Sequence, residues 1–566
     1  MTARLVNRRI RLLVALFAAL FAVTLSRVLW LQGVRAGSLD ALAANQHRET
    51  ITVSARRGTI YDREGRALAI GERAITVYAN PKQITDPDGV ADKVATALDL
   101  KVKNVLPLLS DRSKGFVYLE RKADPAAAEL LERQHIVGLG FLPEERRTYP
   151  QGTVGSEVVG YAGVDNKGLA GLELELDKAL AGSPGSESVV RDPFGRSLKV
   201  VEQTPVRQGR AAYLTVDETL QGQVERILAE TRKEWAAKDA TAIVLDPRTG
   251  AVLALAVEPG FDANHFADVP RDRQRNRAVT DTYEPGSTFK VVTLGAVLES
   301  GLVTPTTRFT LPPSIHVADR VIHDAEPRGT ETMTVAQILS KSSNVGTITL
   351  ALKLGKDRLA QWIDRFGFGH ATGIDFPGES KGIVLPPDRW SGSTIGNVPI
   401  GQGIAVTPIQ MASVYAAVAN GGVWVEPHLV ARVEGGTTPT PKRRRILSER
   451  TTAELTAMLR NVVREGTGTE AQLPGYSIAG KTGTAAKPDP VRGGYSTSKY
   501  VSSFVGFVPA KKPRLCILVT VDEPKGAIWG GSVAAPAFAR IAQFALQYLE
   551  VPPDQPGAAS ETPPTG

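Results

Sequence analysis

The chain has 566 residues, more than one ordinary hydrophobic core can hold, so the sequence predicts two or more domains. A hydrophobic content of 42% and a charged content of 22% are typical of a globular protein. The net charge of +8 is modest for this length and argues against a nucleic-acid partner. The single cysteine, Cys516, excludes an intrachain disulfide, and its apolar neighbours predict a buried place on a strand.

The N-terminus combines a cluster of arginines with a long apolar run. Arginines stand at positions 4, 8, 9 and 11, and no acidic residue precedes Asp40. The apolar run reaches from Leu12 to about Val34, which is long enough to span a bilayer, and Trp30 is placed like an interfacial anchor. A cleaved signal peptide is the alternative, but it requires a short apolar core followed by a small-residue cleavage site.

We therefore predict a single-pass membrane protein with an uncleaved anchor. Residues 1–11 form a cytoplasmic tail and residues 12–34 a transmembrane helix, and everything after them is extracytoplasmic, because arginines favour the cytoplasmic side. Small residues four apart favour packing against another membrane helix. This helix carries such a strip at Ala15, Ala18, Ala19 and Ala22.

Residues 36–225 alternate short β-rich segments with turn residues, and none of these segments presents a nucleophile beside a base. We expect strands over Glu49–Val53, Gly58–Tyr61 and Ala74–Ala79, with a hairpin turn at 63–66.

The following region, 236–550, begins with two strands, continues with a block of helices and then has further strands and a final helix, which predicts a sheet covered by helices. Its short hairpin connections favour antiparallel pairing. The elements expected from 214 onward are a strand at 214–217, a helix over Glu218–Lys233, a hairpin over Thr241–Leu255, strands over Tyr500–Val508 and Leu515–Val521, and a helix over Ala535–Leu549. Residues 551–566 contain five prolines and no apolar pattern, so we expect a disordered tail.

Ser287 and Lys290 are the first candidates for chemistry. The turn Pro285-Gly286 precedes them and an apolar helical pattern follows, so the two side chains share one helix face. A serine hydroxyl becomes a nucleophile when a neighbouring base takes its proton, and a lysine with a lowered pKa can be that base. Taken alone the pattern is weak, because an exposed serine at this position is more often a helix cap.

Two further motifs follow in order along the chain. Ser342-Ser343-Asn344 contains Ser-x-Asn, and Lys481-Thr482-Gly483-Thr484 contains Lys-Thr-Gly. Together with Ser-x-x-Lys these make the known signature of penicillin-binding proteins and class A β-lactamases. With all three motifs, the chain resembles the penicillin-binding transpeptidases of class B, from the arginine-rich start to about Leu549.

The resemblance implies a role for each matched residue. Ser287 attacks a D-alanyl-D-alanine stem peptide, with Lys290 as base, and Ser342 passes a proton to the leaving amine. Asn344 holds the substrate amide and Lys290, while Lys481 adds positive potential and lowers the pKa of Lys290. The hydroxyl groups of Thr482 and Thr484 bind the terminal carboxylate, the backbone N–H groups of Ser287 and Thr484 form the oxyanion hole, and Gly483 leaves room for substrate.

The resemblance also implies an α+β architecture. A transmembrane helix leads to an elongated, β-rich pedestal (dimerisation) domain over 36–225, and a transpeptidase domain with a mainly antiparallel sheet follows over 236–550. No cofactor or metal is expected, because the seven histidines lack metal-ligand spacing. The expected partners are peptidoglycan stem peptides, β-lactam antibiotics, a membrane glycan polymerase and other division proteins.

Several functions share the three motifs. A β-lactamase hydrolyses its acyl-enzyme and is usually one compact domain, while a D,D-carboxypeptidase uses water as acceptor. A β-lactam sensor needs a signalling domain, and only about ten residues precede the apolar run. Within class B, the segment 57–69 and the Ser-Ser-Asn form resemble the septal, division-specific transpeptidase more than the elongation-specific one. The sequence leaves that choice open.

Overall fold

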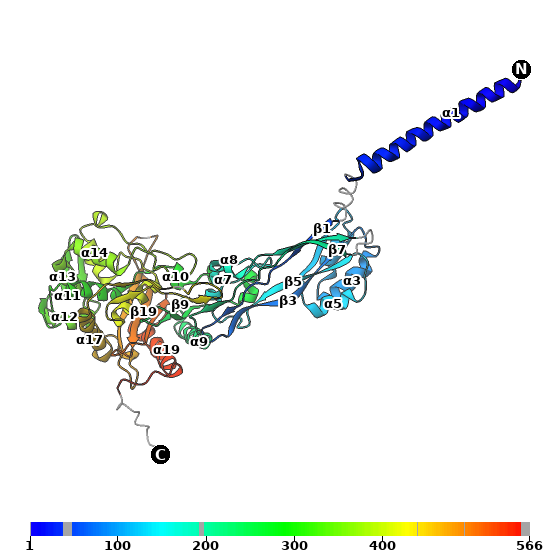
Figure 1. Cartoon of the computed structure of the whole chain (residues 1–566). Helices are drawn as coiled ribbons and strands as arrows, with labels where there is room; N and C mark the ends of the chain where they lie inside the picture. The colour runs from blue at the N-terminus through cyan, green and yellow to red at the C-terminus, as the bar shows by residue number, and fades with distance from the viewer. Residues whose placement is uncertain (1, 38–47, 192–196, 439, 492, 556–566) are drawn as a thin grey trace, which may run out of the picture. The chain divides into compact units, whose positions relative to one another are not determined.

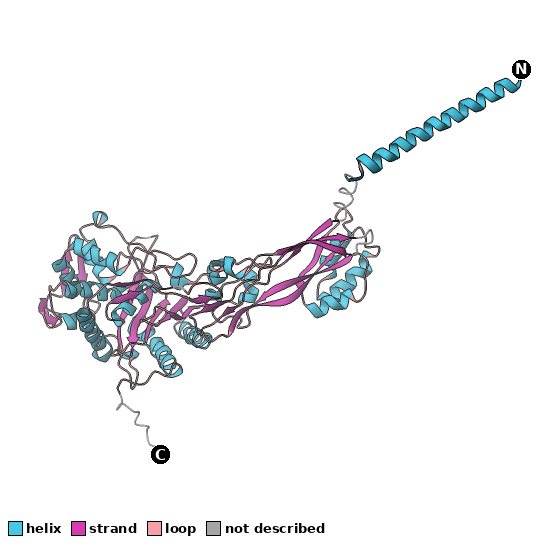
Figure 2. Cartoon of the chain, in the orientation of Figure 1, coloured by secondary structure: helices cyan, strands magenta, loops and turns pink. Residues whose placement is uncertain are grey.

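The computed structural model describes residues 2–37, 48–191, 197–438, 440–491 and 493–555. The chain divides into two compact units, one of residues 1–56 with 182–208 and the other of 57–181 with 209–566. We describe each unit by itself. Figures 1 and 2 show the course of the chain and its helices and strands.

The first unit holds a long apolar helix and a small sheet. Helix α1 (Thr2–Leu29) continues into a π-helical turn, η1 (Trp30–Val34), and residues 6–34 are long and apolar enough to cross a membrane. The guanidinium groups of Arg27 and Arg35 lie 5.1 and 4.6 Å from the centre of the Trp30 ring. The sheet is antiparallel with the order β1 (Arg48–Val53), β6 (Gly185–Arg191), β7 (Ser197–Thr204), which confirms the strand predicted at 49–53.

The second unit begins with a six-stranded sheet that draws on distant parts of the chain. Its order is β16 (Val430–Val433), β8 (Ala212–Leu214), β2 (Ile60–Tyr61), β3 (Ala67–Ala79), β4 (Val117–Ala123), and β5 (Leu139–Thr148) also pairs with β3. The turn predicted at 63–66 joins β2 to β3. Strand β16 comes from the predicted transpeptidase region, so the two predicted regions share this sheet.

Short helices complete this part of the unit. Helices α3 (Pro87–Leu98), α4 (Val102–Ser110) and α5 (Pro125–Glu132) cover one face of β3 and β4 through a core that includes Val77, Val94 and Leu131. Helices α6 (Ser156–Val159), α7 (Gly171–Glu175) and α8 (Asp177–Leu180) follow.

A buried ion-pair network ties these segments together. The carboxylate of Glu173, fully buried in α7, receives Arg57 Nε and Arg147 Nε at 2.6 Å each, and Arg57 also donates to Asp177 at 2.7 Å. Removing one member of such a network leaves buried charge without a partner, which is strongly destabilising.

A five-stranded antiparallel sheet forms the centre of the rest of the unit. Its order is β10 (Val252–Glu258), β9 (Asp239–Leu245), β20 (Leu515–Asp522), β19 (Tyr495–Val508), β18 (Ala479–Pro488). Alternate residues of β20 enter two different cores, Cys516 and Leu518 on one face and Ile517 and Val519 on the other. The sheet is therefore buried on both faces, as expected for a sheet covered by helices.

Helices cover both faces. On one face lie α9 (Glu218–Glu234) and α19 (Ala535–Tyr548), whose Phe538 meets Phe504 of β19 with ring centres 4.7 Å apart. The other face carries a larger block of helices and short strands. Its longer helices are α11 (Lys290–Glu299), α12 (Val335–Ser340), α13 (Asn344–Leu354), α14 (Lys356–Phe366), α16 (Pro408–Ala419) and α17 (Glu449–Glu465).

Shorter elements connect this block. The strands are β11 (Arg308–Leu311), β12 (Ser314–Val317), β13 (Arg320–His323), β14 (Glu331–Thr334), β15 (Val423–Val425) and β17 (Arg443–Arg445). The short helices are η2 (Ala263–Asp268), η3 (Arg271–Gln274), α10 (Arg277–Thr280), η4 (Gly286–Phe289), η5 (Pro387–Arg389), α15 (Thr394–Asn397), η6 (Val398–Ile400), η7 (Thr469–Ala471) and α18 (Gly530–Val533). His316 and His323 lie on the β12–β13 hairpin.

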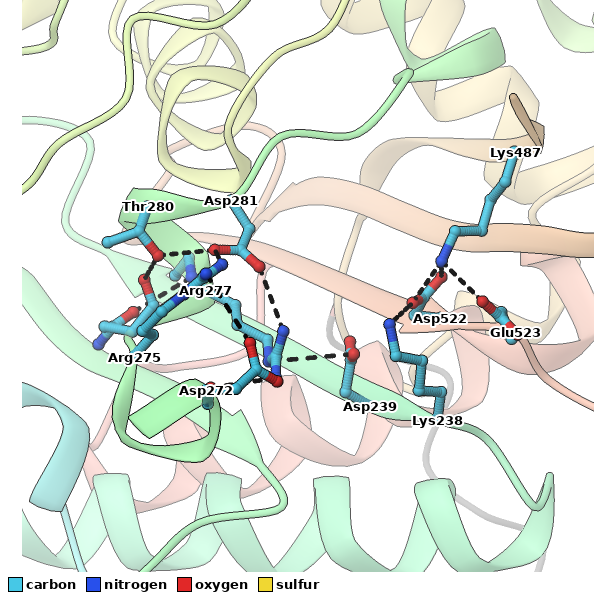
Figure 3. A network of polar contacts seen from close by, with 12 residues as sticks. Lys238, Asp239, Asp272, Arg275, Arg277, Thr280, Asp281, Lys487, Asp522 and Glu523 are labelled. Atoms are coloured by element: carbon cyan, nitrogen blue, oxygen red, sulfur yellow. Dashed lines mark hydrogen bonds and ion pairs between the residues drawn. The ribbon is translucent and has the colours of Figure 1, made fainter. Parts of the chain in front are cut away.

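Figure 3 shows a network of ion pairs where β9 begins and β20 ends. Lys487 of β18 donates to Asp522 at 2.7 Å and to Glu523 at 2.9 Å, while Arg277 of α10 lies 4.0 Å from Asp239. Burial, and next the charge of Asp522, raise the pKa of Asp239 to about 6. The network joins β18, β20 and β9 to α10 at one end of the sheet.

The tail differs from its prediction over its first residues. Val551 is buried, its carbonyl accepts a 2.6 Å hydrogen bond from Tyr476 Oη, and Asp554 accepts one from Ser477 N–H. These contacts join residues 551–555 to the loop before β18. They hold the segment in place although it has no apolar pattern of its own. The rest of the predicted disordered tail, 556–566, lies outside the described residues.

Candidate active site

Ser287 lies in the short helix η4, immediately before α11. Gly286 before it has a φ of +54°, and a side chain there would come within 2.9 Å of the Thr484 carbonyl oxygen. Its backbone N–H donates to the Gly401 carbonyl at 3.0 Å. Glycine is therefore required at this turn both for its backbone angle and for the close approach of β18.

Lys290, one turn further on, is fully buried and faces the second motif. Its ammonium group donates to the Ser342 carbonyl at 2.5 Å, to Ser342 Oγ at 3.2 Å and to Asn344 Oδ1 at 2.8 Å. Burial lowers the pKa of Lys290 to about 7, while the negative charge of Asp324 opposes that shift. Near neutral pH, a substantial fraction of the side chain is therefore uncharged and able to accept a proton.

Ser342 and Asn344 lie in the tight connection between α12 and α13. Ser342 has a φ of +55°, an unusual backbone angle for a residue with a side chain. Ser343 is the N-cap of α13, with Oγ accepting from Gly346 N–H. Asn344 donates its side-chain amide to the His323 carbonyl at 2.9 Å, which turns its oxygen toward Lys290. Such strained residues cluster at functional sites.

Lys481 lies on β18 and is fully buried. Its ammonium group donates to Thr482 Oγ1 at 3.1 Å and to Thr467 Oγ1 at 3.4 Å. Burial, and next the charge of Lys290, hold the pKa of Lys481 well below its usual value. For Lys290 itself burial is the main cause of the lowered pKa. The repulsion between the two lysines acts on both and adds to burial in favouring the uncharged form within the pair.

The other residues of the Lys-Thr-Gly motif lie on β18, close to the nucleophile turn. Thr484 Oγ1 accepts from Gly530 N–H at 3.1 Å, and Thr482 Oγ1 shares a 2.7 Å hydrogen bond with Thr467 Oγ1. A side chain at Gly483 would come within 2.3 Å of Ser503 Oγ and 3.0 Å of the Pro285 carbonyl oxygen. A side chain there would therefore collide with β19 and with the nucleophile turn, while the room for substrate expected from the sequence stays a prediction.

The arrangement brings the three motifs together from η4, the α12–α13 turn and β18. For the part of the chain that the structure describes, Ser287 Oγ makes no hydrogen bond to Lys290 Nζ, which is occupied by the second motif. Catalytic hydrogen bonds are often long before substrate binds, so this geometry is compatible with a base that engages the serine later. The described ranges also contain no group of three His, Cys, Asp or Glu side chains able to hold a metal.

Three further residues contact the site and carry no sequence signal of their own. Thr467 joins Lys481 to Thr482, and Asp324 acts on Lys290. Glu284 accepts hydrogen bonds from Gly403 N–H at 3.0 Å and from Tyr495 Oη at 3.2 Å, next to the nucleophile turn. Thr467 and Asp324 lie outside the three motifs, and Glu284, three residues before Ser287, is held by the distant residues Gly403 and Tyr495.

Comparison with known proteins identifies the family domains that the chain matches. Residues 240–543 match the penicillin binding protein transpeptidase domain, and residues 52–214 match the penicillin-binding protein dimerisation domain. The chain is 35% identical to the penicillin-binding protein PbpB of Mycolicibacterium smegmatis, covering 94% of this chain and 89% of that protein. It is 32% identical to the peptidoglycan D,D-transpeptidase FtsI of Escherichia coli, covering 98% and 94%.

The fold also matches solved structures. The penicillin-binding protein 3 of Mycobacterium tuberculosis, solved in complex with aztreonam, has a TM-score of 0.69 and 31% sequence identity to this chain. The alignment covers 89% of this chain and 98% of that one. The chain therefore belongs to the penicillin-binding protein transpeptidase family. With a dimerisation domain ahead of the transpeptidase domain, it is a class B member and a serine-type transpeptidase.

Proposed function

We propose that this chain cross-links peptidoglycan as a D,D-transpeptidase that works through an acyl-enzyme on Ser287. The observation that carries the proposal is Lys290, a fully buried lysine with a pKa of about 7 that contacts Ser342 and Asn344. A lysine in this state can act as a general base at neutral pH. Burying it in one site with a second lysine, Lys481, has no evident structural benefit, which favours a catalytic role.

In the first half-reaction, Ser287 Oγ attacks the carbonyl carbon of the penultimate D-alanine of a stem peptide. The serine proton passes to Lys290 Nζ, and the negative charge on the carbonyl oxygen is held by the backbone N–H groups of Ser287 and Thr484. The bond to the terminal D-alanine then breaks. Its amine receives a proton through Ser342 Oγ, which lies 3.2 Å from Lys290 Nζ. The products are free D-alanine and an ester on Ser287.

In the second half-reaction, the amine of a neighbouring stem peptide attacks this ester. The amine loses a proton to the base, the bond to Ser287 Oγ breaks, and the serine regains its proton. An amide bond now joins two peptides. Excluding water from the acyl-enzyme until the amine arrives separates this activity from that of a carboxypeptidase.

Substrate binding falls to β18 and its neighbours. β18 is the edge strand of the five-stranded sheet, so an extended peptide can pair with its free side. Thr482 and Thr484 offer hydroxyl groups to the terminal carboxylate, beside the positive potential of Lys481. Asn344 holds the substrate amide. β-Lactam antibiotics acylate Ser287 through the same groups, because their ring amide takes the place of the scissile bond.

Labelling with a fluorescent penicillin tests the acyl-enzyme. Ser287→Ala should abolish labelling with the fold intact, and Lys290→Ala should slow it by about 10³-fold or more, as expected when an activating base is lost. Labelling that persists in Ser287→Ala would show that another residue is the nucleophile. With a stem-peptide substrate and an acceptor amine, formation of the cross-linked dimer distinguishes transpeptidation, whereas release of D-alanine without dimer would indicate a D,D-carboxypeptidase.

We further propose a septal role during cell division, supported by the similarity to FtsI of E. coli along nearly the full length. The expected partners are a membrane glycan polymerase and other division proteins. Depletion followed by microscopy tests the role: filaments indicate division, and rounded cells indicate elongation. Co-purification of the polymerase with the chain tests this partner. The double variant Ala15→Leu with Ala19→Leu tests the small-residue strip of the membrane helix, and it should weaken the co-purification.

The proposed topology places residues 1–11 in the cytoplasm, residues 12–34 in the membrane and the catalytic region outside. The support is the cluster of arginines at the N-terminal end of α1 and the apolar stretch 6–34. We keep 36–225 as the pedestal domain and 236–550 as the transpeptidase domain, which the family matches at 52–214 and 240–543 support. A phosphatase fused after residue 60 should be active, and an inactive fusion there would reverse the orientation.

A further inference from the structure

Asp324 lies just after β13, and its side chain reaches the turn that carries Ser342 and Asn344. Its carboxylate accepts Ser343 Oγ at 2.9 Å and Val345 N–H at 2.9 Å, and it forms an ion pair with Arg328. Only 9% of its side chain is exposed. The group is therefore a nearly buried anion with three partners, directly behind the second motif.

These contacts fix the turn on both sides of Asn344. Asp324 holds the residue before it and the residue after it, while the neighbouring His323 carbonyl holds the Asn344 amide at 2.9 Å. The turn contains the strained backbone of Ser342, which persists only when its surroundings over-determine it. The loop at 323–324 provides that constraint and so aims Ser342 and Asn344 at Lys290.

The same carboxylate acts on Lys290 by charge. Burial lowers the pKa of Lys290, and Asp324 is the group that opposes this shift. Burial of Asp324 would raise its own pKa, but the bonds from Val345, Arg328 and Ser343 hold it below the usual value. These bonds thus favour the ionised form of Asp324. Among the residues that the structure describes, the other ionisable groups in this region include Lys481 on β18 and Arg328, which pairs with Asp324.

We propose that Asp324 is a positioning residue for the transpeptidase reaction: it holds the Ser342–Asn344 turn against Lys290 and keeps a negative charge behind that turn. This inference rests on the proposed function, because it takes Lys290 as the base. It adds to the three motifs a fourth element, which comes from the β13–β14 connection and has no motif of its own.

The experiment measures the second-order rate constant of acylation by a fluorescent penicillin between about pH 5.5 and 9, a range that brackets the pKa of about 7 of Lys290. The rate should fall on the acid side as Lys290 gains a proton. In Asp324→Asn this acid limb should move to lower pH by about one unit, because an opposite charge that favoured the protonated lysine is gone. In Arg328→Gln the limb should move to higher pH, because the charge of Asp324 is no longer compensated.

Two sets of variants separate charge from geometry. Ser343→Ala removes one hydrogen bond to Asp324 but no charge, so it should slow acylation several-fold at all pH values without moving the limb. Asp324→Glu keeps the charge and should keep the limb near its wild-type position. Asp319→Asn and Arg320→Gln are matched controls, because this exposed ion pair lies on the same hairpin, and neither should move the limb.

Acid limbs of Asp324→Asn and Arg328→Gln that coincide with the wild-type limb would overturn the proposal. Should Asp324→Asn fail to fold, the opposite shift in Arg328→Gln still decides the question. Failure of the underlying function has a different signature: Ser287→Ala would then still be labelled. If Ser287→Ala is not labelled and the limbs do not move, the acyl-enzyme stands and only the role of Asp324 falls.

Discussion

The hydroxyl group of Tyr415 donates a 2.8 Å hydrogen bond to the backbone carbonyl of Thr288, the residue after the proposed nucleophile. Tyr415 lies on α16 and is fully buried, 127 positions away in the sequence. The bond holds the turn of η4 from beneath, while Gly401 holds it at Gly286. The position of Ser287 is thus set by the protein interior as well as by the three motifs.

Tyr415→Phe should slow penicillin labelling several-fold, because the Thr288 carbonyl loses its partner and the nucleophile turn loses a constraint. An unsatisfied buried acceptor costs about 1–3 kcal/mol, so the melting temperature should also fall. Tyr476→Phe is the matched control, since it also removes a hydroxyl bonded to a backbone carbonyl, that of Val551. The control should be less stable than wild type but should be labelled at the wild-type rate. If Tyr415→Phe is also labelled at the wild-type rate, Tyr415 only stabilises the fold.

The rate of acylation should depend on pH through Lys290. Its pKa is lowered to about 7 by burial, so the neutral form that accepts a proton dominates above pH 7 and disappears below it. Labelling rates should be nearly constant above about pH 8 and should fall about tenfold per unit well below pH 7. A rate that stays constant down to pH 5 would mean that Lys290 is not the base.

Gly286→Ala should inactivate the enzyme more than its backbone strain alone explains. A residue with a side chain at positive φ costs about 1–2 kcal/mol. Here the new methyl group would also come within 2.9 Å of the Thr484 carbonyl oxygen and push β18 away from Ser287. Gly301 has a φ of +65° with nothing nearby, so Gly301→Ala carries the strain without the contact. Equal labelling by the two variants would remove the steric argument.

Thr484→Val should weaken recognition of a carboxylate. The substitution keeps the volume but removes a donor to a charged group, worth about 1.5–3 kcal/mol, and it also leaves Gly530 N–H without its acceptor. Acylation by penicillins with a free carboxylate should fall about ten- to a hundredfold. Esterified analogues should be much less affected, and an equal loss for both would show that Thr484 shapes the pocket without binding the charge.

Glu225→Gln should stabilise the protein at alkaline pH. Burial raises the pKa of Glu225 from 4.5 to about 7, so between these values the folded state binds a proton that the unfolded state has lost. Stability therefore falls as the pH rises through this window. Glutamine keeps the oxygen that accepts from Gly155 N–H and carries no charge. The variant should melt about 1 °C higher than wild type at pH 8 for each kcal/mol gained in a unit of this size, and the difference should shrink at pH 5.

The exposed Glu230 on the same helix provides the control. It pairs with Arg540 on α19 at the surface, and Glu230→Gln should not raise the melting temperature at pH 8. A gain of the same size in both variants would trace the effect to net charge and not to the buried carboxyl group.

Local patterns in the sequence predicted much of the fold. The hairpin of β9 and β10, helix α9 and helix α19 carry their periodicity and their turns within a few residues, and the structure confirms them. β3 and β19 extend further than predicted. The additional residues of β19, at 495–499, are mostly polar and extend the hairpin with β18, while those of β3, at 67–73, include Gly71 and two charged residues and are held by pairing with β2 and β5. For β3 this pairing depends on β5, which is separated from it in the chain by α3, α4, β4 and α5.

The candidate site divides in the same way. Motifs with fixed spacing contain Ser287, Lys290, Asn344 and Lys481, so these residues could be predicted from the sequence alone. Asp324 and Tyr415 reach the site across 19 and 127 positions, from segments whose composition is ordinary. The left-handed backbone of Ser342 was also not foreseeable, because serine is not a residue that signals positive φ.

The edge position of β18 has a consequence for drug resistance. If substrate and antibiotic both lie along this strand as proposed, they share backbone partners, and a backbone N–H can be removed by no substitution except proline. A proline in β18 would break the strand for the natural peptide as well. Mutations that spare cell-wall synthesis while excluding an inhibitor would therefore have to accumulate in the side chains around the strand, where natural substrate and drug differ in shape.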